Sequence, residues 1–302
     1  MNEKKYSALS IFTDRTETIK EASVHKGLFY PVELIVFIAL YYLLVRRVLV
    51  PLMAKPFLRF VDIKDVNRLM LFKLFITIIP GVFFILYPLF VQKRPLSGIG
   101  FNTTRVNPFR EYIKGLLIGS LMLTVAILAD VAVGGTSFTG FGGVSVLPYI
   151  LLSFFGYMIQ GMEEEIFSRG FLMVSISRRY PVWAGILTNS VLFGMMHIMN
   201  HGVTFISTLN TILVGILFSL IFLKRDSIWM VGAIHSAWNF FQSNIFGQST
   251  SGMATVTSLF KMDVPSGSSW ITGGSYGVEA SIITTILETV IILYLIFKKK
   301  DS

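Results

Sequence analysis

Long apolar runs, each close to the thickness of a lipid bilayer, follow one another along most of this chain. A transmembrane helix needs about 17–25 consecutive, mostly apolar residues. The runs that meet or approach this length are residues 28–45, 69–91, 112–133, 147–177, 181–197, 203–223, 228–246 and 279–297. The sequence therefore predicts an all-α fold, a polytopic transmembrane helical bundle with about eight membrane segments.

Composition agrees with a membrane protein. Only 14% of the 302 residues are charged, whereas soluble domains carry about 25%. The mean hydropathy is +0.69. The alternative, a soluble helical protein with a very apolar core, would spread its apolar residues at core spacing rather than in long runs. The chain has no cysteine, which excludes disulfides, thiolate metal ligands and a cysteine nucleophile.

The net charge of +9 does not indicate a nucleic-acid partner, because Lys and Arg cluster at the ends of apolar runs. Such clusters set membrane topology beside anionic lipid headgroups. The clusters at 178–179, 224–225 and 298–300 lie on one side if the helices alternate, and the loops 134–146, 198–202 and 247–278 lie opposite. The basic residues between 46 and 68 break this pattern, so the topology of the first two segments stays open.

Ionisable residues inside membrane segments are costly and mark functional sites by default. The first such group is Glu163-Glu164-Glu165, followed by Arg169. Glu165 and Arg169 are four residues apart, so they share a helix face and can form an ion pair. Glu164 is rotated by about 100° from that face, which leaves it as the candidate acid–base group. The alternative is a helix end with three carboxylates in water.

Two further groups follow in the next helices. His197 comes four residues after Phe193, at the end of an apolar run. His201, in a loop-like context, is a weaker candidate. His235 and Asn239 are also four residues apart and can direct two N–H donors at one oxygen. Taken singly, these residues are better explained by structural roles: His197 as a hydrogen-bonding or interfacial residue, and His235 and Asn239 as hydrogen-bonding groups between membrane helices.

The depths of these residues make a joint role more plausible than separate structural roles. Measured from the basic residue or loop that ends each helix, they are roughly 21 Å for Glu164, 25 Å for His197, 15 Å for His235 and 21 Å for Asn239. The four side chains are therefore expected in one slab of the membrane. A carboxylate, two imidazoles and a carboxamide can activate water and stabilise a tetrahedral intermediate of amide hydrolysis. No serine nucleophile motif and no His-Glu-x-x-His zinc motif is present.

The motifs Glu-Glu-x-x-x-Arg (164–169), Phe-x-x-x-His (193–197) and His-x-x-x-Asn (235–239) occur in this order. They resemble the three motifs of the CPBP family, the CAAX protease and bacteriocin-processing intramembrane proteases. That family includes the type II CAAX prenyl endopeptidases and the lysostaphin-resistance-A-like proteins. The resemblance covers residues 147–245 most strongly. Gly98 and Gly100, and the later Gly273, Gly274, Gly277 and Glu279, resemble less specific family features.

The resemblance implies that Glu164 and His197 activate the attacking water and that His235 and Asn239 stabilise the oxyanion. Glu165 and Arg169 would hold the site in shape. Family members are described as metalloproteases, and a metal-free glutamate mechanism has also been argued for them, so both stay open. If a divalent metal such as zinc takes part, its ligands would be Glu164, His197 and His235. The prenyl group in the family's name does not identify the substrate of this chain.

The sequence thus predicts an intramembrane endopeptidase, multi-pass in a bacterial cell membrane, that cleaves a membrane-associated peptide or protein. The alternative is a non-catalytic scaffold or bacteriocin-immunity protein of the same fold. A transporter is less consistent with polar residues confined to one half of a chain without repeats. The expected regions are a polar tail (1–27), N-terminal membrane helices (28–133), the catalytic core (147–246), a polar loop (247–278), and a last helix with a basic tail (279–302).

Overall fold

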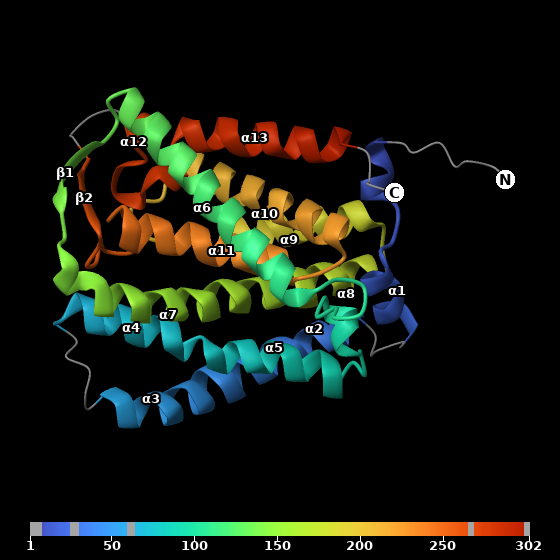
Figure 1. Cartoon of the computed structure of the whole chain (residues 1–302). Helices are drawn as coiled ribbons and strands as arrows, with labels where there is room; N and C mark the ends of the chain where they lie inside the picture. The colour runs from blue at the N-terminus through green and yellow to red at the C-terminus, as the bar shows by residue number, and fades with distance from the viewer. Residues whose placement is uncertain (1–7, 25–29, 59–63, 265–268, 299–302) are drawn as a thin grey trace.

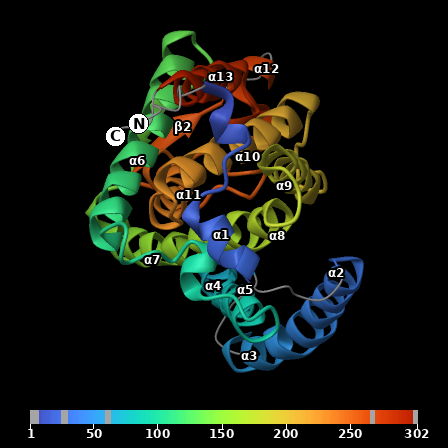
Figure 2. The ribbon, with the colours of Figure 1, turned by 90° about the vertical axis from the view of Figure 1, so that its right-hand side faces the viewer.

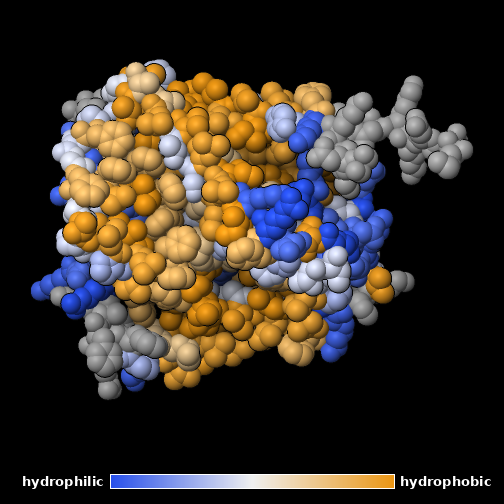
Figure 3. Space-filling model, in the orientation of Figure 1, coloured by the Kyte–Doolittle hydropathy of each residue, from blue (hydrophilic) through white to orange (hydrophobic). Residues whose placement is uncertain are grey.

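The computed structural model describes residues 8–24, 30–58, 64–264 and 269–298. Its long helices run side by side between two ends (Figure 1), and a belt of apolar surface separates the polar ends (Figure 3). In the described part of the chain, five helices are long and apolar enough to cross a membrane, and two apolar helices are shorter. The protein is therefore an integral, multi-pass helical bundle, as predicted.

The elements carry the labels of Figure 1. The α-helices are α1 (Glu17–Val24), α2 (Tyr30–Ala39), α3 (Val50–Leu58), α4 (Val66–Ile76), α5 (Ile78–Phe90), α6 (Pro108–Ala132), α7 (Leu147–Glu165), α8 (Val174–Ser177), α9 (Val182–Met196), α10 (Phe205–Arg225), α11 (Trp229–Phe240), α12 (Ser269–Thr272) and α13 (Ile282–Phe297). Three π-helical stretches continue neighbouring helices: η2 (Leu40–Leu49), η5 (Ile166–Met173) and η6 (Phe241–Ile245). Short 3-10 turns are η1 (Ala8–Phe12), η3 (Leu96–Ile99), η4 (Val144–Val146), η7 (Gly274–Tyr276) and η8 (Val278–Ala280).

The two ends of the bundle differ in what they carry. The basic end holds the connections 91–107, 178–181 and 226–228, together with α1 and the end of α13 (Figure 1). The loop end holds the connections 133–146, 197–204 and 246–281. There β1 (Ser137–Phe141) pairs antiparallel with β2 (Phe260–Asp263), with an irregularity between Phe138 and Gly140. This small sheet is the only strand pairing among the described elements, so the all-α prediction holds for the bundle.

The first membrane helix is longer than predicted. We expected it to end at Arg46-Arg47, but α2, η2 and α3 form one continuous helix from Tyr30 to Leu58, so that boundary is wrong. The charge of Arg47 is accommodated locally, because its guanidinium donates to the Tyr42 hydroxyl at 3.1 Å and lies 5.3 Å from that ring's centre. Lys55 near the end of α3, Lys64 just before α4 and Arg68 in the first turn of α4 consequently lie at the loop end, which accounts for the irregular charge pattern seen in the sequence.

The second membrane segment is interrupted, as its prolines predict. The helix breaks at Thr77, between α4 and α5. Pro80 has no N–H to offer the carbonyl of Ile76, and its ring crowds that carbonyl. At the break, the Thr77 hydroxyl donates to the carbonyl of Leu74, three residues earlier, at 2.6 Å. The other predicted segments each contain a helix whose ends differ from the prediction by a few residues; the last begins at Ile282 rather than at residue 279.

Close helix packing at small residues brings the later helices together. A Cβ atom at Gly115 or Gly119 of α6 would overlap backbone carbonyls of α11, and one at Gly161 of α7 would overlap Ser236 of α11. Helices in membranes associate through such close contacts because burying apolar surface gives little driving force there. These contacts place α11 directly between α6 and α7 (Figure 1).

Candidate active site

Glu165 and Arg169 form a fully buried ion pair at the start of η5. Nη1 of Arg169 lies 2.8 Å from Oε1 of Glu165, and neither side chain is exposed. Nη2 of Arg169 also donates to the carbonyl of Gly215 on α10, at 3.2 Å. The spacing-based expectation of this pair therefore agrees with the structure. A π-helical turn directly after three glutamates is also notable, since such turns occur frequently at functional sites.

His235 of α11 joins this pair. Its Nδ1 lies 2.8 Å from Oε1 of Glu165, and its Nε2 lies 3.7 Å from Oε2 of Glu164. An ionised carboxylate only accepts hydrogen bonds, so Nδ1 carries the hydrogen shared with Glu165. The Nε2 side of the ring consequently faces Glu164. Glu165 thus does more than neutralise Arg169, because it also fixes the orientation of His235.

Gln160, which the sequence analysis did not single out, connects Glu164 to Asn239. Its Nε2 donates to Oε1 of Glu164, and its Oε1 accepts from Nδ2 of Asn239 at 3.0 Å. Glu164 therefore makes no ion pair with Arg169, as expected, but it is not isolated. Gln160 lies one helical turn before Glu164, so the same spacing argument that linked Glu165 to Arg169 could have identified it.

His197 caps the C-terminal end of α9. Its Nδ1 lies 2.8 Å from the carbonyl oxygen of Phe193, one turn earlier. A carbonyl oxygen only accepts, so Nδ1 carries hydrogen and the Nε2 atom of the neutral ring holds the free lone pair. The side chain is partly exposed. This tautomer suits His197 for accepting a proton or a hydrogen bond at Nε2.

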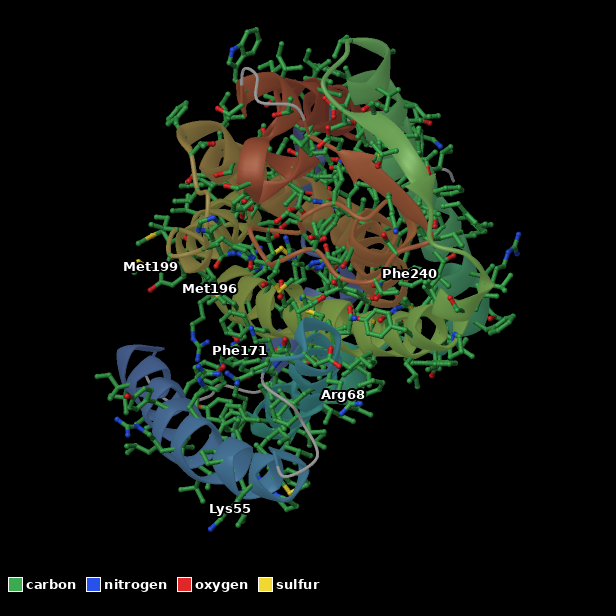
Figure 4. The ribbon with its side chains drawn as sticks, turned by 90° about the vertical axis from the view of Figure 1, so that its left-hand side faces the viewer. Lys55, Arg68, Phe171, Met196, Met199 and Phe240 are labelled. Carbon is green, nitrogen blue, oxygen red and sulfur yellow. The ribbon has the colours of Figure 1, made fainter. Side chains whose placement is uncertain are left out.

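One cavity of about 700 Å³ receives the side chains of Glu164, His197, His235 and Asn239. Its other walls include Gln160, Glu163 and Ser168 of the α7–η5 helix, aromatic residues of α2, η2 and α5, and the cationic Arg46 and Lys73. The predicted residues therefore meet in one cavity. His201 does not reach it and lines a separate pocket at the loop end. Figure 4 views the molecule from that end, with Met196 on the side of α9 that faces the first membrane helix.

A second, smaller pocket of about 50 Å³ lies behind the same residues. His197, His235 and Asn239 line both hollows, and Glu279 and Glu288 line the smaller one. Glu279 accepts hydrogen bonds from Nε1 of Trp238, at 3.1 Å, and from the backbone N–H and hydroxyl of Ser251, at 2.6 and 2.9 Å. A pocket of this size holds from one to a few water molecules. Glu279 thus ties the loop after η6 to the helix that carries His235.

A metal site is not formed by these residues as they stand. Among residues 8–24, 30–58, 64–264 and 269–298, no three His, Cys, Asp or Glu side chains are grouped so that they could hold a metal ion. Glu164 and His235 approach each other, but the ring nitrogen that faces Glu164 is 3.7 Å away. As it stands, the donor arrangement does not fit the three-ligand set of Glu164, His197 and His235 that the resemblance implies.

Comparison with known proteins gives one family. The model of the type II CAAX prenyl endopeptidase Rce1-like family matches residues 146–241. No curated protein and no solved structure matches the chain. The matched range contains Gln160 and all the motif residues from Glu164 to Asn239, and it excludes the first membrane helices and the loop after η6. Over residues 146–241, this chain is therefore similar to the Rce1-like family of type II CAAX prenyl endopeptidases, in agreement with the resemblance of its sequence motifs.

Proposed function

We propose that this protein is an endopeptidase that hydrolyses a peptide bond of a membrane-associated peptide or protein inside the bilayer. The observation that carries the proposal is the convergence of Glu164, His197, His235 and Asn239 on one cavity, although they come from three helices. A water-accessible cavity with this donor and acceptor set is what hydrolysis within a membrane requires. The match to a CAAX protease family over residues 146–241 supports the same activity.

Glu164 and His197 are the groups proposed to activate water. Oε1 of Glu164 is held by Gln160, which leaves Oε2 for the attacking water. His197 presents Nε2 with its lone pair, because Nδ1 donates to Phe193. The water attacks the scissile carbonyl carbon as its proton passes to Glu164. The same proton then moves to the departing amine nitrogen when the C–N bond breaks, so that the carboxylate is regenerated.

His235 and Asn239 are proposed to stabilise the oxyanion. One N–H of the Asn239 amide donates to Gln160, and its second N–H remains for an oxygen in the cavity. His235 donates through Nε2 when both ring nitrogens carry hydrogen, since Nδ1–H is already directed at Glu165. Two donors aimed at the developing charge typically account for a large part of the rate enhancement in acyl transfer.

The test starts by finding a substrate. Protein termini in membranes from cells expressing the wild type are compared with those from cells expressing Glu164→Gln, and a substrate so found is incubated with purified protein. We expect Glu164→Ala and His197→Ala to lower turnover by about 10²–10⁴-fold while leaving the melting temperature unchanged. Asp263→Asn, at β2 and away from the cavity, is the matched control and should retain full activity.

Two results would count against the proposal. Cleavage that persists in both variants would remove Glu164 and His197 from the reaction. If cells that express either variant behave like cells that express the wild type, and no cleaved product is found, the scaffold or immunity role would be favoured. A metal requirement is tested in the same assay by chelation followed by addition of zinc.

A further inference from the structure

The catalytic cavity connects to only one end of the bundle. Asn200, Ser251 and Met253 are the loop residues that line it, and all three belong to connections at the loop end. Within the described chain, no residue of 91–107, 178–181 or 226–228, the connections at the basic end, lines the cavity. Access from water therefore runs through the loop end.

Aromatic packing closes the opposite side. The Phe37 ring lies 4.2 Å from the Phe171 ring and 6.0 Å from the Phe84 ring, and the Tyr41 ring lies 5.3 Å from that of Phe84, centre to centre. These contacts attach the first half of the continuous helix 30–58 to α5 and η5. Beyond them α3 diverges from α4 toward the loop end (Figure 1), and the continuous helix 30–58 stands apart from α9 (Figure 2). The gap between it and α9 therefore widens toward the loop end.

Two short helices, α9 and α13, leave a recess in the membrane surface at the loop end. α9 has 15 residues and α13 has 16, which correspond to about 22 and 24 Å, whereas the apolar core of a bilayer is about 30 Å thick. Both helices have one end beside basic residues, at Arg178-Arg179 and at Lys298. Their other ends consequently stop below the opposite membrane surface. His197, at the C-terminal end of α9, lies at the bottom of this recess.

A pocket of about 660 Å³ continues the recess. Met253 lines both this pocket and the catalytic cavity. Gln248, 3% exposed, contributes to its wall. Its Oε1 accepts from the backbone N–H of Val278 at 3.3 Å, whereas its Nε2 has no hydrogen-bond partner in the structure. The lining contains no charged side chain apart from His201 when protonated, and it includes the glycines Gly247, Gly252, Gly274 and Gly277. A neutral, polar peptide segment with a carbonyl oxygen for Gln248 fits this chemistry.

The distribution of basic residues orients the bundle. At the basic end, the described Lys and Arg residues are Arg15, Lys20, Lys93, Arg94, Arg105, Arg110, Lys114, Arg178, Arg179, Lys224, Arg225 and Lys298. At the loop end they are Lys55, Lys64, Arg68 and Lys261. Short loops rich in Lys and Arg remain in the cytoplasm, and acidic residues contribute little to this rule. The bias places the basic end in the cytoplasm despite Lys55, Lys64 and Arg68 at the loop end.

We infer that the catalytic cavity opens to the non-cytoplasmic face of the membrane, and that its substrate is a peptide segment presented from that face with a neutral polar part in the pocket of Gln248. The identity of the occupant as a substrate rests on the proposed function, whereas the orientation does not. The substrate class that follows is an exported or membrane-anchored peptide, not a protein modified in the cytoplasm.

The absence of native cysteines makes a direct test available. Thr139→Cys at the loop end, Met253→Cys at the cavity entrance and Thr103→Cys at the basic end are expressed singly and treated with a membrane-impermeant maleimide. We expect Thr139→Cys and Met253→Cys to be labelled in intact bacterial cells, and Thr103→Cys only after permeabilisation. Labelling of Thr103→Cys in intact cells, or protection of either other cysteine until permeabilisation, would overturn the inference. The pattern does not depend on cleavage, so it stands or falls separately from the protease activity.

The pocket of Gln248 is tested with two substitutions at one position. Gln248→Glu keeps the acceptor for Val278 but loses the amide donor, and Gln248→Met loses both. We expect each to raise KM about 10-fold, with kcat retained, because the contact is made with bound substrate before and during reaction. An unchanged KM for Gln248→Glu, in protein with the wild-type melting temperature, would remove this pocket from substrate binding while leaving the labelling result intact.

Discussion

Nδ1 of His235 lies 2.8 Å from Oε1 of Glu165, although 70 positions separate the two residues. The same oxygen atom accepts from Nη1 of Arg169 at 2.8 Å. One buried carboxylate oxygen therefore joins a cation on its own helix to an imidazole on another. Arg169, Glu165 and His235 form a fixed unit behind the cavity, and Glu164, one residue away, is left facing the open space.

This unit predicts a large stability effect at Glu165. Glu165→Gln removes the charge that neutralises the buried Arg169, and breaking a buried ion pair costs about 3–5 kcal/mol. We expect a lower melting temperature in detergent, together with lost turnover because His235 is no longer oriented. Glu17→Gln, which removes a carboxylate from the exposed Lys20 pair, should change stability by no more than about 1 kcal/mol. Equal effects of the two substitutions would contradict the structural role of the buried pair.

Substitution of Gln160 is expected to lower kcat selectively, with little effect on KM. Gln160→Met keeps a similar volume but removes both the donor to Glu164 and the acceptor for Asn239. We expect kcat to fall about 10–100-fold, which corresponds to about 1.4–2.7 kcal/mol of transition-state stabilisation, with little change in KM. Steady-state kinetics on a peptide substrate measure both parameters. A change in KM alone would mean that Gln160 contacts substrate rather than positioning the catalytic groups.

The close contact at Gly161 leads us to expect that the spacing between α7 and α11 determines the positions of the site residues. A Cβ atom at this position would overlap Ser236 of α11, so Gly161→Ala should separate α7 from α11 and displace Glu164 and Glu165 from His235. We expect a lower melting temperature and lower kcat. Gly140→Ala is the matched control, because a Cβ there meets only the Lys261 side chain at 3.8 Å. Wild-type stability and activity in Gly161→Ala would show that the close approach is not needed.

Zinc binding can be tested through the melting temperature, independently of protease activity. Because the described side chains do not form a three-ligand group, we expect zinc to raise the melting temperature of wild type and of His197→Ala by the same small amount. Thermal unfolding with and without added zinc measures this difference. A stabilisation by zinc that is present in wild type and absent in His197→Ala would establish His197 as a ligand and require the side chains to move together on binding.

Relationships within one helix could be predicted from the sequence, because helical periodicity fixes which residues share a face. This explains the agreement for Glu165 with Arg169 and for His235 with Asn239, and Gln160 was accessible by the same argument. Contacts between helices were not accessible. The bond from Glu165 to His235 depends on the close approach at Gly161 and Ser236, which no single-helix pattern contains.

The first membrane helix illustrates a different limit. Paired arginines usually mark the end of a membrane span, so Arg46-Arg47 gave a wrong boundary. In the structure, Arg46 lines the cavity that holds Glu164 and His197, and Arg47 interacts with Tyr42. Charges inside a span become acceptable only when a water-filled space or a partner is nearby. The cavity that provides this space is built by helices distant in sequence, so the exception could not be recognised from the residues around position 46.

The shortness of α9 has a consequence for the surrounding lipid. A helix of about 22 Å in an apolar layer of about 30 Å creates hydrophobic mismatch, which the bilayer relieves by thinning at a cost of fractions of a kcal/mol per Å. The annulus of acyl chains beside Met199, which is 91% exposed, is therefore expected to be thinned. Bilayers of shorter acyl chains relieve this mismatch. The acyl-chain length of the lipid therefore affects how far below the membrane surface the His197 side chain lies.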